Sequence, residues 1–421
     1  MRGNSIMKNS PLNGLNGLNG LNGLNGLNGL NGLNGLNGLK AFLETKPKEY
    51  HKFDPSRFIQ IYKDFKNAFF EIQAKVIHVV GTNGKGSTGR FLTLLLADQN
   101  FKVLHFTSPH VFEFRERFFL NGSVVGESVL ENAHQQLQSH AFSSACSYFE
   151  YATLLAVMLA KDCDYLVLEA GLGGEFDSTN ALEKTLSIFT PIDYDHKEFL
   201  GDSLESIAQT KLKAMGSLNI IAPQQELVLN TAQKIAKEKH AKLILVQNEI
   251  SKGVRDYIER YHLARFLAMN LEVALKAFET LVPCKEQEVL KNLKPLDLIG
   301  RCELLSPNIL IDVGHNPHSA KALKEEIKRI FNAKIILIYN CYQDKDAFLV
   351  LEILKPVVKK VLILELHEER VIKLEKLKGI LETLGLEYAL FEDLKENENY
   401  LVYGSFLVAN AFYKRYQKKR D

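Results

Sequence analysis

The chain has 421 residues, well beyond one average domain, so two domains are expected. Apolar residues make up 46% and charged residues 24%, a mixture typical of a soluble globular protein with enough apolar material for a core. The net charge of +2 lacks the basic excess of a general polyanion binder, which excludes nucleic acid as an expected partner.

Signals for membranes and secretion are missing from the sequence pattern. No run approaches the length of about 18 uncharged apolar residues that a membrane-spanning helix needs, so we expect no membrane partner. Residues 1–11 lack the apolar core of a signal peptide. The five cysteines are scattered without CxxC spacing, which argues against a zinc site or a disulfide framework. We therefore expect a protein of the reducing cytoplasm.

Residues 12–38 read Leu-Asn-Gly nine times over. Three residues per repeat is too short for a stacked repeat module, and a Leu at every third position fits neither the helix nor the strand period. Asn-Gly pairs favour turns, and glycine raises the entropy cost of ordering. We interpret residues 1–38 as a low-complexity, disordered and inert extension; a specific role in binding or assembly is the alternative.

From residue 39 onward, strand and helix patterns alternate. Helical spacing over residues 40–70 is interrupted by two prolines. The strands then expected are residues 76–80, 102–106, 165–169, 186–190, 219–222 and 242–246, and the helices are residues 90–98, 149–159 and 204–215. Such alternation predicts an α/β fold with a mostly parallel sheet covered by helices on both faces.

A second, smaller set of elements begins near residue 295. We expect strands at residues 309–313, 335–339, 361–364 and 401–402, and a helix at residues 319–331. The sequence therefore predicts an ATP-binding domain at 39–295 and a C-terminal α/β domain of Rossmann-like type at 296–421, with the boundary near Pro295 and Gly300.

The most informative segment is residues 81–88, Gly-Thr-Asn-Gly-Lys-Gly-Ser-Thr, between a β-branched strand and a helix. A glycine loop in this place aims backbone N–H groups at a phosphate, and the helix dipole adds partial positive charge. Lys85 supplies a point charge for the β- and γ-phosphates, and Ser87 or Thr88 places a hydroxyl near phosphate and Mg²⁺. The expected nucleotide-binding residues here are Thr82, Asn83, Gly84, Lys85, Gly86, Ser87 and Thr88.

This loop resembles the ATP loop of the folylpolyglutamate synthase/dihydrofolate synthase family, which belongs to the Mur-type ATP-dependent amide ligases. Further motifs resemble that family in the same order, over about residues 46–410. They are Thr-Ser-Pro-His at 107–110 with Glu-Arg at 116–117 and Asn-Gly at 121–122, Phe-Glu at 149–150 with Thr153, residues 168–174 with 177–180, Asp-His at 195–196, Leu-Gly at 200–201, Ile-Ala at 207–208, Gly-Arg at 300–301, residues 312–318, Asp-Lys-Asp at 344–346 and Gly-Ser at 404–405.

The resemblance implies an enzyme that joins a carboxylate to the amine of L-glutamate at the expense of ATP. Phosphoryl transfer from ATP would form an acyl phosphate, which the amine then attacks; this chemistry needs phosphate binding, metal ions and positioning. By resemblance, Ser108, Glu169 and His196 are Mg²⁺ ligands. Hydroxyl and carboxylate oxygens suit this hard ion, and Glu169 ends a strand, where α/β sheets place their sites.

The family also carries a lysine that is carbamylated near the metals. Spacing from the motif histidine assigns it to Lys211, with Lys213 as a rival alignment. Lys85, Lys211 and His315 are the expected catalytic residues. Asn270, Arg301 and Asp312 match nucleotide-binding positions, and His315 and Asn316 are assigned to the active-site cleft, with mere loop shaping by Asn316 and Pro317 as the alternative. The implied cofactors are ATP and Mg²⁺, with K⁺ as a further candidate, and the family favours a monomer.

The sequence departs from the family pattern in two places. Glu175 stands where the family usually has Arg, which puts contacts with an acidic substrate in question. Residues 46–58 match poorly the segment that helps hold the pterin in relatives, so pterin recognition is less secure than catalysis.

Three functions remain open at this point. The first is ligation of L-glutamate to dihydropteroate, to reduced folates, or to both. The second is a Mur-type ligase for another acid, which the Asn-Gly-Lys-Gly-Ser loop and the Ser-Pro-His segment disfavour. The third is a nucleotide-binding scaffold with a degenerate site, against which Lys85, Glu169 and His196 argue.

Overall fold

The computed structural model describes residues 38–46, 57–283 and 286–418. The Leu-Asn-Gly repeat before Gly38 and most of the atypical segment at 46–58 lie outside the described residues. The chain divides into two units, Met1–Thr45 and Lys46–Asp421, each described here by itself. In the first unit the structure describes one short helix, α1 (Leu39–Glu44).

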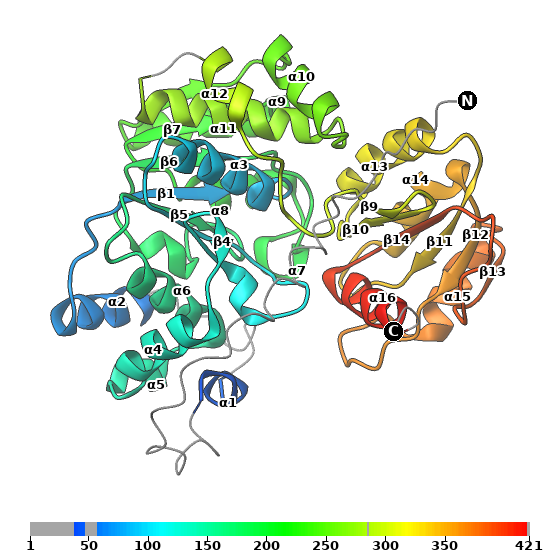
Figure 1. Cartoon of the computed structure of the whole chain (residues 1–421), viewed down its shortest axis with the longest axis horizontal. Coiled ribbons are helices and arrows are strands. Elements are labelled where there is room, and N and C mark those ends of the chain that lie inside the picture. The colour runs from blue at the N-terminus through cyan, green and yellow to red at the C-terminus, as the bar shows by residue number, and fades with distance from the viewer. Residues whose placement is uncertain (1–37, 47–56, 284–285, 419–421) are drawn as a thin grey trace, which may run out of the picture. The chain divides into compact units, whose positions relative to one another are not determined.

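The first sheet of the second unit has eight strands in the order β4-β3-β2-β5-β1-β6-β7-β8 (Figure 1). Its strands are parallel except for the β2–β3 and β3–β4 pairs at one edge. The bounds are β1 (Lys75–Val80), β2 (Val103–Phe106), β3 (Phe118–Leu120), β4 (Ser123–Val124), β5 (Tyr165–Glu169), β6 (Leu186–Phe189), β7 (Leu218–Ile221) and β8 (Lys242–Leu245).

Helices cover both faces of this sheet, as the β-branched, fully buried central strand requires. Ile77 and Val79 of β1 pack with α3 and α11, whereas Val80 points the other way, into a cluster with α8 and α9. The helices are α2 (Arg57–Ala68), α3 (Lys85–Asp98), α4 (Glu127–Gln138), α5 (Ala141–Ala145), α6 (Tyr148–Leu159), α7 (Lys197–Leu200), α8 (Leu204–Leu212), α9 (Glu226–Glu238), α10 (Lys252–Arg260), α11 (Leu267–Leu281) and α12 (Glu286–Asn292), with 3₁₀ turns η2 (Phe114–Arg117) and η3 (Ser178–Ala181).

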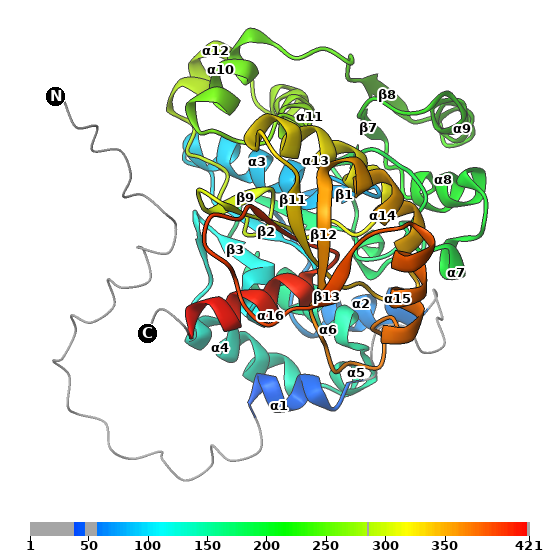
Figure 2. The same ribbon diagram turned by 90° about the vertical axis from the view of Figure 1, so that its right-hand side faces the viewer.

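The second sheet has six strands in the order β13-β12-β11-β14-β10-β9, of which only the edge strand β9 is antiparallel. Figure 2 brings this sheet and its helices to the front. One face packs with α13, α14 and α15, and the other with α16. The elements are β9 (Glu303–Ser306), β10 (Ile309–Asp312), α13 (Pro317–Ile330), β11 (Ile335–Tyr339), α14 (Ala347–Leu354), η4 (Lys355–Val357), β12 (Val358–Ile363), α15 (Leu374–Thr383), β13 (Tyr388–Leu390), β14 (Tyr400–Tyr403) and α16 (Phe406–Gln417).

We call the part of the second unit built on the eight-stranded sheet the first lobe, and the part built on the six-stranded sheet the second lobe. The predicted α/β class with mostly parallel sheets is confirmed. The helix after the glycine loop begins at Lys85, five residues before the predicted start at Arg90. The antiparallel edge strands β3, β4 and β9 were not predicted, because they are too short to show a period.

Candidate functional site

A cavity of about 1200 Å³ lies in the second unit, where loops after strands of both sheets meet. Of the residues predicted for the site, all except Thr88, Lys211 and Asn316 line this cavity. They follow β1, β2, β5 and β6 in the first lobe and flank β9 and β10 in the second, and one comes from α11. The carboxyl ends of parallel strands are where α/β folds bind their ligands.

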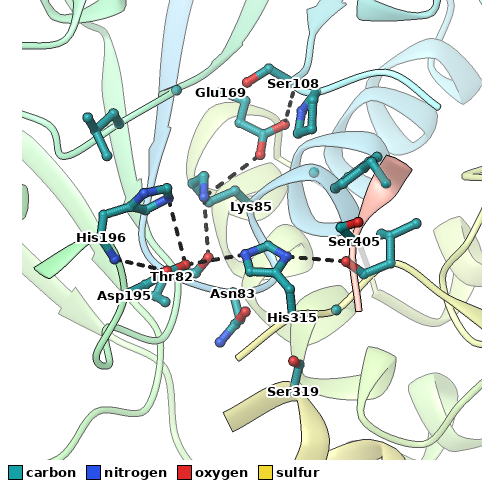
Figure 3. A pocket seen from close by; sticks show the side chains of 18 of the residues that line it. Thr82, Asn83, Lys85, Ser108, Glu169, Asp195, His196, His315, Ser319 and Ser405 are labelled. Carbon is teal, nitrogen blue, oxygen red and sulfur yellow. Dashed lines mark hydrogen bonds and ion pairs between the residues drawn. The ribbon is translucent and has the colours of Figure 1, made fainter. Parts of the chain in front are cut away.

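The loop between β1 and α3 is shaped to hold a phosphate. Gly84 has a φ of 87°, and a Cβ at this position would lie 2.5 Å from Oδ1 of Asn270, so glycine is required. The N–H groups of the first turn of α3 lie at this loop, where the helix dipole is positive. Nζ of Lys85 donates to the carbonyl oxygen of Thr82 at 3.3 Å and lies 3.9 Å from Oε1 of Glu169 (Figure 3).

Gly86, the extra glycine between the lysine and the serine, has a steric reason. A Cβ on Gly86 would lie 3.3 Å from Oγ1 of Thr107, 3.4 Å from Oε2 of Glu169 and 3.6 Å from a guanidinium nitrogen of Arg301. The Thr107 contact is tighter than most Cβ contacts and would require a shift of a few tenths of an ångström, whereas the other two distances are ordinary van der Waals contacts. Gly86 therefore leaves room for the side chains that surround the phosphate loop.

The two hydroxyl groups that follow Gly86 have different surroundings. Ser87 lines the cavity. Thr88 is fully buried, does not line it, and its hydroxyl has no hydrogen-bond partner among the described residues. Of the two hydroxyls that the sequence left open, Ser87 is the one that a molecule in the cavity can reach.

Glu169 ends β5 and is held by the two residues that follow β2. Its Oε2 accepts hydrogen bonds from Oγ1 of Thr107 and, at 3.0 Å, from the backbone N–H of Ser108. The side chain is 5% exposed. Its second oxygen faces Lys85, so the carboxylate has a fixed orientation beside the phosphate loop.

His196 is the residue directly before α7 and has a φ of 50°. Its side chain lines the cavity (Figure 3). Burial lowers the pKa of His196 to about 3, although the neighbouring Asp195 opposes this shift, so the imidazole is neutral near pH 7. Burial alone would raise the pKa of Asp195, but His315, His196 and Lys345 outweigh it and hold that pKa well below its ordinary value.

The donor set of Ser108, Glu169 and His196 fits a hard divalent cation. It supplies a hydroxyl, a carboxylate that two donors orient, and an uncharged ring nitrogen. Among the described residues no group of three or more His, Cys, Asp and Glu could hold a metal by itself. Such a cation would therefore depend on the serine and on oxygens of a bound phosphate, as is usual for Mg²⁺.

Lys211 does not line the cavity but lies behind the phosphate loop. It is 3% exposed, and its Nζ donates to the carbonyl oxygen of Gly81 at 3.0 Å. Burial, together with the charge of Lys85, lowers the pKa of Lys211 to about 7. The rival Lys213 is about half exposed and pairs with Glu175 at 3.2 Å. Only Lys211 has the buried environment that perturbs an amine.

The Lys213–Glu175 pair also accounts for the departure at Glu175. The loop that carries Glu175 packs against α8, because a Cβ on Gly174 would lie 2.7 Å from the carbonyl oxygen of Lys211. The N–H of Glu175 donates to the carbonyl oxygen of Thr210. Glu175 thus holds its loop to a neighbouring helix.

Side chains of the second lobe reach the phosphate loop directly. The amides of Asn83 and Asn316 exchange two hydrogen bonds, at 3.2 and 2.9 Å, and Nδ2 of Asn83 lies 2.8 Å from Nδ1 of His318. Asn316 also caps α13. Its side chain therefore does more than shape its own loop.

Asp195 is a second meeting point of the lobes. Its Oδ1 accepts a 2.7 Å hydrogen bond from Nζ of Lys345, and its Oδ2 lies 3.4 Å from Nε2 of His315. Both Asp195 and Lys345 are less than a tenth exposed. His315 is therefore held at the centre of the cavity (Figure 3).

The remaining predicted residues are Arg301 and Asp312 of the second lobe and Asn270 of the first. The guanidinium of Arg301 lies 5.1 Å from the ring centre of Phe406. Asp312 accepts backbone N–H bonds from Cys302 and Gly314, and burial raises its pKa. Asn270, on α11, lies against Gly84.

Several apolar and aromatic side chains contribute to the lining of the cavity, and we refer to them together as the aromatic arm. They are Phe58, Phe149, Leu172 and Phe176, and they line the cavity together with Asp177, whose carboxylate accepts N–H bonds from Leu172 and Thr179. The expected site set did not contain these residues, nor Asp195 or Lys345. Three of them lie in motifs that the sequence analysis had noted and could have been predicted from these: Asp195 in Asp-His, Asp177 in Asp-Ser-Thr-Asn and Lys345 in Asp-Lys-Asp.

Over the part of the chain that the structure describes, no helix is both long enough and apolar enough to cross a membrane.

Comparisons with known proteins agree with this geometry. Residues 79–276 match the Mur ligase middle domain, and residues 300–402 match the Mur ligase glutamate ligase domain. The dihydrofolate synthase/folylpolyglutamate synthase of Buchnera aphidicola is 30% identical over 377 residues, which cover 82% of this chain and 90% of that protein.

Two solved structures are also similar. The crystal structure of Helicobacter pylori folylpolyglutamate synthetase is 94% identical, with a TM-score of 0.79, and the match covers 92% of this chain and all of that one. E. coli FolC in complex with DHPP and ADP is 27% identical, with a TM-score of 0.77, over 90% of this chain and 97% of the other. The chain thus has the Mur-ligase-like fold, and it belongs to the dihydrofolate synthase/folylpolyglutamate synthase family of ATP-dependent ligases.

Proposed function

We propose that the protein ligates L-glutamate to dihydropteroate and to the γ-carboxylate of reduced folates, with an acyl phosphate as intermediate. ATP would phosphorylate the acid, and the amine of glutamate would displace phosphate. The observation that carries this proposal is the single cavity that joins a phosphate loop, an oriented carboxylate, cations of the second lobe and an aromatic arm.

The phosphate loop would bind the triphosphate of ATP. The first-turn N–H groups of α3 and the charge of Lys85 face the position where negative charge develops on the transferred phosphoryl group. Arg301 adds a second cation near Gly86, and Asn270 and Asp312 would contact the rest of the nucleotide. E. coli FolC was solved with ADP, which supports a nucleotide here.

Ser108, Glu169 and His196 would hold Mg²⁺, which supplies charge neutralisation of the phosphates when bound. Hydrogen bonds within the protein hold Glu169 in a fixed orientation for this role. Thr107 and the N–H of Ser108 both donate to the same carboxylate oxygen, so little reorganisation is needed when a cation arrives.

His315 would act on the amine of glutamate. Its Nε2 lies 3.4 Å from the Asp195 carboxylate and its Nδ1 lies 3.3 Å from the carbonyl oxygen of Val313, so the ring has a fixed orientation in the cavity. A ring held in this way would orient the amine for its attack on the acyl phosphate. Lys345, in the same cluster, keeps positive charge where carboxylates and phosphate meet.

Lys211 would be carbamylated. A buried amine whose pKa is lowered to about 7 is about half neutral near pH 7, and only the neutral amine reacts with CO₂. The resulting carbamate would offset the charge of Lys85. Carbon-13 NMR after growth with labelled bicarbonate should show a carbamate signal that is absent from Lys211→Met; an unchanged spectrum would exclude the modification.

The aromatic arm would hold the ring system of the acid substrate. Flat apolar walls suit a flat heteroaromatic ring, and Asp177 lies among them as a buried acceptor. DHPP in the E. coli structure supports an acid of this kind. Glu175 pairs with Lys213, so its negative charge is offset, and it is no obstacle to an acidic substrate.

The experiment is phosphate release from ATP with L-glutamate, Mg²⁺ and K⁺, comparing 7,8-dihydropteroate with tetrahydrofolate. Turnover with both acids supports the bifunctional enzyme, and turnover with one alone restricts the proposal to that activity. No turnover with either, in a protein that still binds ADP, would refute it and leave another acid as the substrate. Omitting K⁺ tests that ion separately.

The remaining expectations stay part of this proposal. We place the enzyme in the cytoplasm as a monomer, with domains at 39–295 and 296–421 and residues 1–38 as an inert extension. The two domain matches, which end at residue 276 and begin at residue 300, are compatible with such a boundary. Sedimentation at micromolar concentration tests the monomer.

A further inference from the structure

The segment that joins the two lobes, residues 293–299, is anchored to the first lobe at three points. Two are backbone carbonyl groups: that of Leu293 accepts a hydrogen bond from the hydroxyl of Tyr261, and that of Lys294 accepts one from Tyr257. The third is the Asp297 carboxylate, whose Oδ1 lies 2.6 Å from a guanidinium nitrogen of Arg90. The segment is thus held as far as Asp297.

Arg90 is an unusual anchor because it is a buried cation. It lies in α3, the helix that starts at the phosphate loop, and its side chain is 3% exposed. Its guanidinium stacks 3.5 Å from the ring centre of Phe119, and its Nε donates to Nδ1 of His105 at 3.2 Å. Burial, and then the charge of Arg90, keeps the pKa of His105 well below its ordinary value, so this ring is an uncharged acceptor.

A buried guanidinium with an uncharged acceptor on one side needs an anion on the other. Asp297 is the carboxylate in contact with Arg90 among the described residues, and its own side chain is 40% exposed. Arg301 lies close enough to oppose the charge of Arg90. This arrangement gives the Arg90–Asp297 pair a fixed geometry, since breaking it would leave a buried charge without its partner.

The chain joins the second lobe immediately afterwards. Gly300 has a φ of 69°, and a Cβ there would lie 2.6 Å from a methyl group of Val313. The N–H of Val313 donates to the carbonyl oxygen of Gly300, and the N–H of Gly300 donates to Glu303. Only Leu298 and Ile299 therefore separate the anchor at Asp297 from the glycine that leads into Arg301.

We propose that Arg90 and Asp297 are positioning residues that place Arg301 at the phosphate loop. The pair links the nucleotide-binding helix to the connecting segment at Asp297, four positions before Arg301, which enters the cavity near Gly86. Arg301 is also held from the second lobe by Phe406. This inference rests on the proposed function in one respect, that Arg301 contacts the phosphates of a nucleotide.

The test is a double-mutant cycle on ADP affinity, measured by isothermal titration calorimetry with the full chain. Asp297→Asn keeps the shape and removes the charge. We expect it to weaken ADP binding about fivefold in the native background and less than about twofold in an Arg301→Lys background, since coupled residues are not additive. Asp256→Asn, which breaks an exposed ion pair with Lys252, is the matched control and should leave ADP affinity unchanged.

A merely structural role for Asp297 gives a different pattern. The loss in ADP affinity would then be the same with and without Arg301, or only the unfolding temperature would fall; either result overturns the inference. If Asp297→Asn is too unstable to measure, Arg90→Lys, which keeps the charge but loses the paired donors, replaces it in the same cycle. Native protein that binds no ADP would overturn the proposed function together with this inference, whereas native binding without coupling would overturn the inference alone.

Discussion

Replacing Thr107 by valine would test how Glu169, the proposed metal-binding carboxylate, is held in place. Thr107 is 7% exposed, and its hydroxyl donates to Oε2 of Glu169, which also accepts the N–H of Ser108. The change removes one of two donors to this oxygen at nearly constant volume. A hydrogen bond to a charged group contributes about 1.5–3 kcal/mol, so we expect the free energy of unfolding to fall by about that amount.

The effect on the metal should be larger than the effect on the fold. Residues that orient a metal ligand typically alter affinity or activity about 10–100-fold when they are replaced. Phosphate release measured over a Mg²⁺ titration should therefore show a 10–100-fold higher half-saturating Mg²⁺ concentration in Thr107→Val. Thr93→Val is the matched control, since Thr93 is also buried and donates only to a backbone carbonyl of its own helix. Equal Mg²⁺ dependence in both variants, at an equal loss of stability, would refute the reasoning.

Four further outcomes are expected. Lys85→Ala should lower kcat at least about a thousandfold with an unchanged unfolding temperature, since we propose Lys85 as the cation at the phosphoryl group; normal turnover would contradict the loop assignment. In protein that lacks the carbamate, Lys211 has a pKa lowered to about 7 in the folded state, so unfolded chains bind more protons between pH 7 and about 10.5, and native stability should rise through that window; urea unfolding in CO₂-free buffer should show this rise in the native protein and not in Lys211→Met, and parallel curves would rule out the buried amine. Glu175→Arg should lower the free energy of unfolding by about 0.2–1 kcal/mol, and the charge-swapped double variant Glu175→Arg/Lys213→Glu should restore it. The KM for the acid substrate should be the same in all three proteins; a changed KM would make Glu175 a substrate contact. Deleting residues 1–38 should leave kcat within about twofold, as composition predicts for an inert extension, and a large loss would give the repeat a function.

The sequence predicts the features that depend on residues close together in the chain. Residues 76–88 show the strand, the glycine loop and the helix, because a β-branched run and glycine spacing are local signals. The fold class follows from the alternation of such segments. The motifs that resemble the family identify most residues of the cavity, including Glu169, His196 and Asp312, since each ends or follows a strand.

What the sequence did not predict depends on contacts between distant segments. The narrow space at Gly86 arises from Thr107, Glu169 and Arg301, which come from three other parts of the chain. Spacing already assigned Lys211 ahead of Lys213, but the burial of Lys211 behind the phosphate loop was not predicted. Neither feature can be inferred from the spacing of residues in the sequence, because tertiary packing determines both.

The contacts between the lobes make the phosphate loop sensitive to the position of the second lobe. Asn83, next to the glycine that shapes the loop, exchanges both amide hydrogen bonds with Asn316. Asp195, next to the candidate metal ligand His196, holds Lys345 and His315. Activation of the acid and attack by the amine need different residues around the same phosphate. These contacts connect the residues of the two lobes that lie there. If the lobes part, Asn83 and Asp195 lose their partners together, so the parts of the site for nucleotide, metal and amine are complete only while the lobes are in contact.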